Sequence, residues 1–399
     1  MYPPGPHPFN GMPQTAMFEH VDTQIISDPA ALLALADRLR KAPRIAFDTE
    51  AASFHRYTDR VYLIQLSSDQ ETALVDPLAL PDLSALGALL GDDHIEVVFH
   101  DADYDLRVLD RDYGFRARHV FDTRIAAQLL GEPAIGLAAL LEKYLGVTLD
   151  KKLQRADWSI RPLTREMVAY AAADTMHLPR LRDLLAGKLE AAGRWAWAKE
   201  EFGQLEALRW TGASAEEGYL RLKGAKLLPR RAQAVLRSLH HWREQVAQGL
   251  DRSPFRVMPN EALLALARSV PQSPEQLHAV RGLPSSLAKR YGDQLLAAVE
   301  RGLATPLDTL VIPERTPRHR PDASQEARFE RLKLLRNQRA AELGLEPGVI
   351  CPNGALQAIA RAAPTGREAL TGVVELRRWQ IEALGAPAIL AAAADPAGQ

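Results

Sequence analysis

RIAFDTE, residues 44–50, is the stretch of this chain that decides its fold. Its first four residues, Arg44 to Phe47, are mostly apolar and predict a short buried strand. Successive side chains of a strand point to opposite faces, so Asp48 and Glu50 are expected on one face at the strand's end. Two carboxylates on the same side of a sheet oppose folding unless something positive lies between them.

A third carboxylate follows a second strand. Residues 95–99, IEVVF, predict a buried strand, and the helical spacing of Leu106 and Leu109 predicts a helix after it. This places Asp105 on the first helical turn, just past the strand end. Asp103 is two residues away and would face elsewhere on such a helix.

A helix after residue 164 adds a phenol and a fourth carboxylate. Thr164 is a candidate N-cap, and Tyr170 and Asp174, four residues apart, share one face of the helix. Oxygen ligands suit magnesium or manganese better than zinc, and the sequence has no clustered Cys and His set. Two such ions can stabilise the attacking and leaving oxygens of a phosphoryl displacement, and the tyrosine hydroxyl could hold or deprotonate the attacking water.

Each motif taken alone has an ordinary structural explanation. Acids after a strand or in a first helical turn, and a tyrosine on an alanine-rich helix, are usually structural. Only their joint occurrence favours a site. Asp101, Asp103 and Asp122 compete with the chosen acids, and we interpret Asp122 as a supporting residue. His100 is interpreted as a packed or hydrogen-bonded core residue, because an oxygen-only ligand set is already complete.

Three motifs in order carry a family resemblance: DTE at 48–50, HDADYD at 100–105 and YAAAD at 170–174. Together they resemble the signature of the tyrosine-containing branch of the DEDD exonucleases, and in particular bacterial ribonuclease D. The resemblance covers most of residues 22–200 through three further stretches, LIQL at 63–66, FDTRIAAQLLG at 121–131 and LDKKLQRADWSIRPLT at 149–164.

The resemblance implies a metal-dependent 3′-5′ exoribonuclease that releases 5′-mononucleotides from single-stranded RNA 3′ ends, with transfer RNA precursors as substrates. Two divalent metal ions, Mg or Mn, are the implied cofactors. The implied metal ligands, which are also catalytic, are Asp48, Glu50, Asp105 and Asp174. Tyr170 is implied as the further catalytic residue, which positions the attacking water.

Basic and aromatic residues precede the helix that carries Tyr170. Lys152, Trp158 and Arg161 are candidates for touching phosphates or stacking a base. Trp158 would suit a buried core equally well. Two longer segments, 221–231 and 315–339, are rich in Lys and Arg and could neutralise phosphates, although a solvated helix face would explain either segment.

Composition limits what the whole chain can be. Its 399 residues, 47% of them hydrophobic, suffice for two or three domains, and its formal net charge is only -1. The single cysteine, Cys351, excludes an internal disulfide and fits a reducing compartment. No apolar run of membrane-spanning length or secretory signal appears. We therefore expect a soluble, cytoplasmic protein without a membrane partner.

The second half of the chain contains an internal repeat. PNEALLALARSVP at 259–271 recurs 93 residues later as PNGALQAIARAAP at 352–364. A long helix is expected before each copy, at 230–248 and 325–343. Both copies resemble the helicase-and-RNase-D C-terminal (HRDC) module, and the second is the more diverged.

We therefore expect an α/β ribonuclease-H-like exonuclease domain, with a mixed sheet flanked by helices, followed by two small all-α domains. Strands are expected near 44–48, 61–67, 72–76, 95–99 and 119–122. The expected divisions are a flexible tail (1–20), the exonuclease domain (21–205), a first HRDC-like domain (206–303), a linker (304–323) and a second, diverged HRDC-like domain (324–395).

Two alternative functions remain open. Metal-bound carboxylates do not read the sugar, so the same chemistry could act on DNA. The chain could also be a nucleic-acid-binding scaffold with a vestigial nuclease site, although its acid set is intact. A phosphatase for small molecules would leave the two helical modules without a purpose. Metal-dependent hydrolysis of tailed RNA and DNA separates these possibilities.

Overall fold

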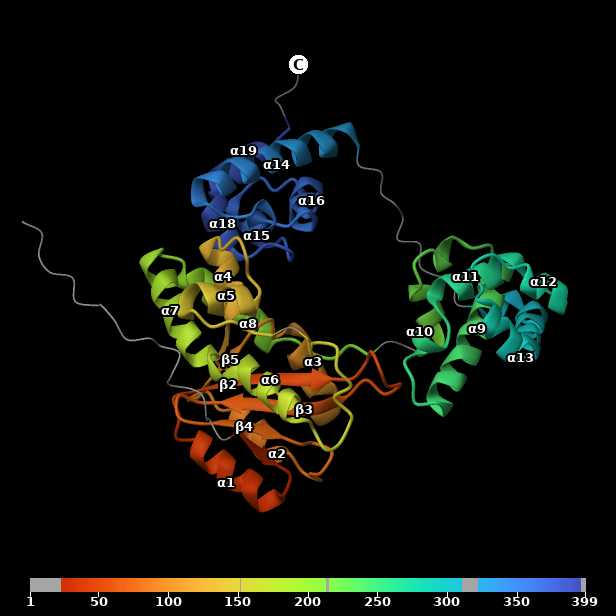
Figure 1. Cartoon of the computed structure of the whole chain (residues 1–399). Coiled ribbons are helices and arrows are strands. Elements are labelled where there is room, and N and C mark those ends of the chain that lie inside the picture. The colour runs from red at the N-terminus through yellow and green to blue at the C-terminus, as the bar shows by residue number, and fades with distance from the viewer. Residues whose placement is uncertain (1–22, 151, 213–214, 311–321, 396–399) are drawn as a thin grey trace, which may run out of the picture.

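The computed structural model describes residues 23–150, 152–212, 215–310 and 322–395. In Figure 1 these residues form an α/β domain in the N-terminal half and two helical domains after it. The expected tail lies outside the described residues, as does most of the expected linker. None of the helices in the described part of the chain has the length and apolarity needed to cross a membrane.

A six-stranded mixed sheet forms the centre of the first domain, in the order β1-β4-β3-β2-β5-β6. The strands are β1 (Gln24–Ile26), β2 (Arg44–Ala51), β3 (Val61–Ser67), β4 (Thr72–Val75), β5 (Glu96–Phe99) and β6 (Val120–Asp122). The β2–β3 and β3–β4 pairs are antiparallel hairpins, whereas β5 and β6 follow helices and run parallel to β2. The predicted mixed sheet is confirmed. Its three-residue β1 was not predicted, because so short a segment carries no periodicity.

Helices cover both faces of this sheet (Figure 1). They are α1 (Pro29–Leu39), α2 (Ser84–Leu90), α3 (Asp103–Tyr113), α4 (Thr123–Leu130), α5 (Leu137–Leu145), α6 (Arg165–Met176), α7 (Leu178–Ala191) and α8 (Trp195–Glu206). Ile45 and Phe47 of β2 pack with α1, α2 and α3, whereas Ala46 packs with α4, α5 and α7. The alternation along β2 places Asp48 and Glu50 on the Ala46 side, where α6 contacts β2 and β3.

The two helical domains repeat one arrangement. The first contains the 3₁₀ segments η2 (Ala215–Arg221), η3 (Ala225–Leu227) and η4 (Leu307–Thr309) and the helices α9 (Arg230–Gly249), α10 (Pro254–Val257), α11 (Asn260–Ser269), α12 (Pro274–His278) and α13 (Ser285–Ala304). The second contains α14 (Ala323–Leu343), α15 (Pro347–Ile350), α16 (Asn353–Ala362), α17 (Arg367–Thr371), α18 (Arg378–Leu384) and α19 (Ala386–Ala393). Helices α10 to α12 begin and end 93 residues before α15 to α17, which confirms the predicted repeat.

A buried arginine repeats together with the helices. Arg243 in α9 donates hydrogen bonds to the Met258 carbonyl at 3.2 Å and to Asn260 Oδ1 at 2.7 Å. Arg336 in α14, 93 residues later, makes the equivalent two bonds at 3.1 Å and 2.7 Å. Each long helix is thereby tied to the Pro-Asn turn that opens the next full helix.

The two copies differ in their last helix. Helix α13 runs unbroken over 20 residues, whereas its counterpart is divided into α18 and α19 at Gly385. Pro387 has no backbone N–H, and its ring would clash with the preceding turn of a continuous helix. Helix α18 lies against the exonuclease domain, where Trp379 stacks on Trp197 at 5.0 Å and donates to Glu201 Oε1 at 2.6 Å.

Arginines of the two basic segments are engaged within the protein. In α14, Arg328, Arg331 and Arg339 each donate to a backbone carbonyl of the same domain. In α9, Arg231 donates to the Leu303 and Thr305 carbonyls at the C-terminal end of α13. These guanidinium groups hold neighbouring elements together, which gives these four arginines a structural role. Residues 311–321 lie outside the described part of the chain.

Candidate active site

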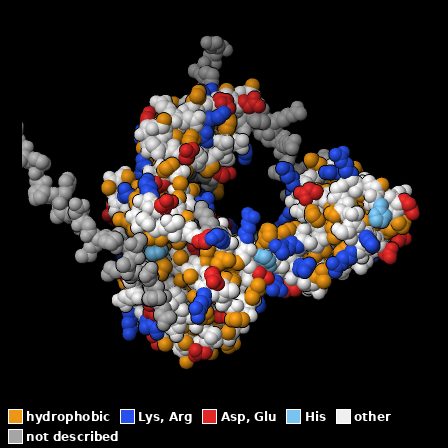
Figure 2. Space-filling model, in the orientation of Figure 1, with side chains coloured by type: hydrophobic (Ala, Val, Ile, Leu, Met, Phe, Trp, Pro, Cys, Tyr) orange, Lys and Arg blue, Asp and Glu red, His pale blue; other side chains and the backbone are white. Residues whose placement is uncertain are grey.

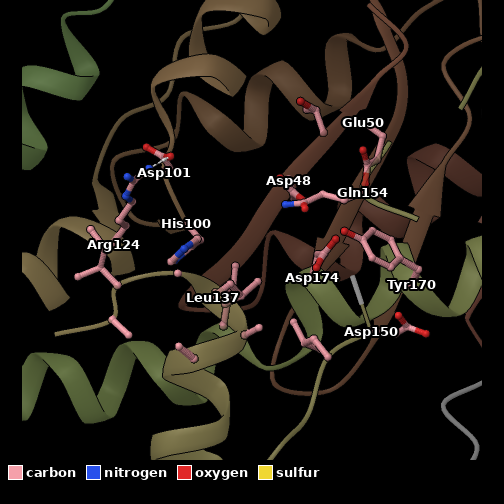
Figure 3. A pocket seen from close by; sticks show the side chains of 18 residues that line it. Asp48, Glu50, His100, Asp101, Arg124, Leu137, Asp150, Gln154, Tyr170 and Asp174 are labelled. Carbon is pink, nitrogen blue, oxygen red and sulfur yellow. Dashed lines mark hydrogen bonds and ion pairs between the residues drawn. The ribbon is translucent and has the colours of Figure 1, made fainter. Parts of the chain in front are cut away.

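Acidic side chains of β2 and α6 line a pocket of about 690 Å³. Asp48 and Glu50 enter it from the end of β2, and Tyr170 and Asp174 of α6 line it from the other side (Figure 3). Helix α6 begins at the predicted N-cap, Thr164, whose side chain accepts a hydrogen bond from the Met167 N–H at 3.2 Å. The four-residue spacing then directs the phenol and the carboxylate to the same side of the helix.

Asp105 lies in the first turn of α3 and is not among the residues that line the pocket. Its side chain is buried, and Thr49, which lines the pocket between the two acids of β2, donates a hydrogen bond to Asp105 Oδ1 at 2.5 Å. Asp103 is exposed and pairs with Arg107 at 2.7 Å. The two aspartates therefore face apart, as predicted from their spacing.

The four carboxylates oppose one another's ionisation. Burial raises the pKa of Asp48 to about 8, and the charge of Asp174 adds to the rise. Burial, followed by the charge of Asp48, raises the pKa values of Glu50 and Asp105 well above their usual range. Burial raises the pKa of Asp174 to about 7. A cation bound here would offset the cost of holding these groups as carboxylates.

The donor set fits a hard divalent cation. All four candidate ligands are carboxylates, which suit magnesium and manganese. Within the described ranges, no three His, Cys, Asp or Glu side chains are already arranged to hold one ion. Ion binding would therefore require the carboxylates to turn toward a common point. Three of the four predicted ligands, Asp48, Glu50 and Asp174, line the pocket, and the fourth, Asp105, is hydrogen-bonded to Thr49 in its wall.

Tyr170 is held in place for hydrogen bonding. Its ring packs against Trp158, with 5.9 Å between centroids, and its hydroxyl points toward Asp174 in Figure 3. Burial, aided by the negative charges of Asp174 and Glu50, raises the pKa of Tyr170 above its ordinary value. A phenol in this state stays protonated at neutral pH, so it can hold a water molecule but is a poor base.

Two of the three residues predicted to touch RNA before α6 have structural roles instead. Trp158 is 1% exposed, so it has no free face for a base and the stacking prediction is wrong. Arg161 forms a two-pronged ion pair with Asp76, at 2.6 Å and 2.8 Å, so its guanidinium group is occupied. Lys152 is exposed and pairs with Asp150, a residue that lines the pocket.

Asp122 has the predicted supporting role, and His100 is hydrogen-bonded as predicted but also lines the pocket. Asp122 is the N-cap of α4 and accepts a hydrogen bond from the Ala102 N–H at 2.8 Å, which fixes the start of α3. His100 Nδ1 lies 2.9 Å from Thr123 Oγ1. Burial lowers the pKa of His100 to about 4, so this ring is neutral at pH 7.

Sequence reasoning missed two parts of the pocket. The Gln154 carboxamide reaches toward Asp48, and an ion pair between Arg124 and Asp101 closes the far end (Figure 3). Gln154 and Arg124 both lie in stretches that carry the family resemblance. Their place in those stretches was the one sequence signal that could have identified them as pocket residues. Neither residue type is distinctive by itself.

Family models match all three domains. A model described as a 3′-5′ exonuclease matches residues 23–190, and a model described as an HRDC domain matches residues 232–299 and 325–392. These matches confirm the exonuclease domain and both copies of the helical module.

Whole-chain comparisons agree with the domain matches. Ribonuclease D of Zymomonas mobilis is 33% identical, over 92% of this chain and 93% of that protein. Ribonuclease D of Escherichia coli K12 is 35% identical over 73% and 77%. The crystal structure of Escherichia coli RNase D, described as an exoribonuclease involved in structured RNA processing, matches with a TM-score of 0.71 at 30% identity, covering 93% of this chain and 98% of that one. The catalytic core of RRP6 from Trypanosoma brucei matches with a TM-score of 0.61 at 29% identity, covering 72% and 80%. The chain belongs to the ribonuclease D family of 3′-5′ exoribonucleases.

Proposed function

We propose that this protein removes 5′-mononucleotides one at a time from single-stranded RNA 3′ ends, in the processing of transfer RNA precursors. The observation that carries this proposal is a single pocket lined by Asp48, Glu50, Tyr170 and Asp174, with the buried Asp105 hydrogen-bonded to Thr49 in its wall. A volume of about 690 Å³ is in the range of pockets that hold small ligands, so it can take the terminal nucleotide of a strand. Membership of the ribonuclease D family supports RNA as the substrate.

We propose two divalent ions, Mg²⁺ or Mn²⁺, as cofactors. Their ligands would be Asp48, Glu50, Asp105 and Asp174. The raised pKa values of these groups mean that a bound cation is needed to keep them ionised together, which supports this proposal. Ions bound there would polarise the scissile phosphodiester and stabilise the departing 3′ oxygen.

The protein's own groups would orient the reactants. The Tyr170 hydroxyl, kept protonated by its raised pKa, would hold the attacking water beside Asp174. The hydrogen bond from the Thr49 hydroxyl to Asp105 Oδ1 would hold the Asp105 side chain in one rotamer. This rotamer would set the direction of the second oxygen, Oδ2. Gln154, beside Asp48, would hydrogen-bond the terminal nucleotide, and Lys152, which pairs with the pocket residue Asp150, would contact a phosphate.

We also propose the cytoplasm as the place of action. The curated relatives are bacterial ribonuclease D enzymes. The one cysteine, Cys351, is buried and unpaired, which suits a reducing compartment.

The test is a time course with 5′-labelled RNA and a matched DNA, both with single-stranded 3′ tails, in Mg²⁺ or Mn²⁺. We expect a metal-dependent ladder that shortens from the RNA 3′ end and is absent in Asp105→Asn. Asp103→Asn is the matched control, because Asp103 is two residues away, exposed and paired with Arg107. Equal degradation of DNA would make the protein a general exonuclease. Tails that bind yet stay intact with every metal would overturn the catalytic proposal.

A further inference from the structure

Two exposed aromatic rings meet where the exonuclease domain contacts the first helical domain. Phe54 lies in the loop after β2, and Phe255 lies in the first turn of α10. Their ring centroids are 5.0 Å apart, with an angle of 58° between the planes. The side chains remain 41% and 40% exposed, so the contact leaves much of both rings open to solvent.

Two arginines converge on the same rings. The guanidinium carbon of Arg256 lies 4.9 Å from the Phe54 ring centroid, and that of Arg155 lies 5.9 Å from it. Both arginines are exposed, and neither pairs with an acidic side chain within the described ranges. Arg56, in the same junction, is instead engaged by Asp157 and Asp251. The patch therefore has unneutralised positive charge, unlike the structural ion pair beside it.

Other contacts hold this junction together. Ser253 is 1% exposed and donates its hydroxyl to the Ser53 carbonyl at 2.5 Å. Asp251 binds Arg56 at 3.2 Å across the two domains. His55 Nε2 lies 2.8 Å from the Arg155 carbonyl and ties the two exonuclease-domain loops together. The junction is therefore held by contacts that do not involve the exposed rings or the two unpaired arginine side chains.

Both loops run directly from the acid pocket to this patch. Phe54 follows Glu50 by four residues, and Arg155 follows Gln154, which lines the pocket. Figure 2 shows a hollow between the exonuclease domain and the helical domains, with Lys and Arg side chains along the side of the first helical domain that faces it. A strand that left the pocket along these loops would meet the rings next.

We propose that Phe54, Phe255, Arg155 and Arg256, here called the junction patch, form a stacking site for one base of the single-stranded RNA upstream of the scissile nucleotide. An aromatic ring stacks any unpaired base, and flanking arginines neutralise the phosphates on either side. Duplex bases are already stacked and cannot use such a site. The inference rests on the proposed function, because it assumes that the strand's 3′ end occupies the acid pocket.

The junction patch would grip the strand without reading its sequence. It contributes ring faces and charge but no group placed to read a base edge, so its affinity should be sequence-tolerant and salt-sensitive. It would also act only on strands long enough to extend from the acid pocket to the rings. Affinity should therefore rise once a tail reaches that length.

The test measures RNA binding by the full chain in EDTA, where cleavage cannot occur. Oligoribonucleotides of about ten nucleotides, each with one 2-aminopurine at a different position, report stacking by fluorescence quenching. We expect maximal quenching at one internal position. Phe255→Leu keeps an apolar contact with Phe54 but removes a ring, so it should abolish that maximum and weaken binding about tenfold. Arg256→Gln should weaken binding and lower the salt dependence by about one phosphate contact.

The matched charge control is Arg281→Gln, because Arg281 is exposed in the same domain and lies outside the patch. It should bind like the wild type. The loss in Phe255→Leu should be greater for a strand of about ten nucleotides than for a dinucleotide, which is too short to reach the rings. A quenching maximum that survives in Phe255→Leu, or an equal loss at both lengths, would overturn the proposal and leave the rings as a domain contact.

The metal-free design separates this inference from the proposed function. Wild-type protein that binds and quenches at one position, but never cleaves with metal, would contradict the hydrolysis and not the patch. Wild-type protein that cleaves tailed RNA, but shows no position-specific quenching, would contradict the patch and not the hydrolysis. Thermal unfolding of each variant identifies any loss of binding that follows from a loss of folding.

Discussion

Replacing Thr49 by valine should uncouple Asp105 from the strand that carries the first two acids. The Thr49 hydroxyl donates a 2.5 Å hydrogen bond to Asp105 Oδ1, and the two residues are 8% and 6% exposed. Valine keeps the β-branched shape that suits a strand, so the substitution removes the bond and little else. A hydrogen bond to a charged group contributes about 1.5–3 kcal/mol. At about 1.36 kcal/mol for each factor of ten, kcat/KM should fall by about 10- to 150-fold.

The assay is the initial rate on a single-stranded oligoribonucleotide, measured across a series of metal concentrations. If the bond orients Asp105 as a ligand, the metal concentration at half-maximal rate should rise together with the loss of rate. Thr49→Ser retains the hydroxyl and should restore both. Thr72→Val is the matched control, because Thr72 is also buried in the sheet and its hydroxyl lies 2.9 Å from Ser67 Oγ and not against a carboxylate.

A wild-type rate and metal dependence in Thr49→Val would refute this reasoning, because other contacts would then suffice to hold Asp105. Urea unfolding of both valine variants gives a second criterion. If the rate falls in proportion to lost stability in Thr49→Val and Thr72→Val alike, the effect is on folding and not on the orientation of the carboxylate. A rate loss confined to Thr49→Val identifies the hydrogen bond as its cause.

Three further predictions concern the rest of the molecule. Trp379→Ala should destabilise the protein by about 3–5 kcal/mol and speed amide exchange in both α18 and α8, because this buried ring joins two domains. Burial lowers the pKa of His240 to about 4, so between pH 6.5 and 4 the unfolded chain binds a proton that the folded chain does not, and stability falls as pH falls. His240→Gln should remove up to about 3 kcal/mol of this loss in urea unfolding at pH 7.5 and pH 4.5. Mg²⁺ or Mn²⁺ added after EDTA should raise the Tm of the wild type and not of Asp174→Asn, because a ligand that binds only the folded state stabilises it.

Each of these predictions has a contradicting result. Unchanged exchange in α8 of Trp379→Ala would mean that the second helical domain is not anchored through this ring. A His240→Gln variant with the wild-type pH dependence would assign the acid sensitivity to other groups. An equal rise of Tm in Asp174→Asn would place the stabilising ion outside the pocket. Glu201→Gln, which keeps the ring while weakening its hydrogen bond, is the control for Trp379→Ala.

The acid site could be predicted from sequence because each of its residues has a fixed place in a regular element. The alternation of β2 directs Asp48 and Glu50 to one side, and the four-residue spacing on α6 does the same for Tyr170 and Asp174. Local geometry decides these directions before any tertiary contact forms. The fold then brings β2 and α6 together, as the order of the motifs indicated.

The RNA contacts could not be predicted in this way, because distant partners decide which side chains remain free. Arg161 is occupied by Asp76, which lies 85 residues away in sequence. Arg328 and Arg331 bond to carbonyls at the ends of helices that follow much later. The junction patch shows the opposite case, since Phe54 and Phe255 are about 200 residues apart and neither has a local signal.

The duplicated helical module has diverged into two different attachments. In the first copy, the turn before α10 is joined to the exonuclease domain by Ser253, and Phe255 follows it. The position 93 residues after Phe255 is a glycine, Gly348, so the second copy has no ring there. Conversely, the position 93 residues before Trp379 is Ser286, so the first copy lacks the docking tryptophan.

These differences in sequence give the two copies separate roles, although they share one helical arrangement. The arginine that ties the long helix to the Pro-Asn turn is present in both copies, because both need it to fold. The break at Gly385 occurs in the second copy, where α18 lies against the exonuclease domain. We infer that the second copy serves to dock, whereas the first leaves its rings and arginines open beside the acid pocket. Changes to the first copy should therefore alter RNA affinity, and changes to α18 should alter stability.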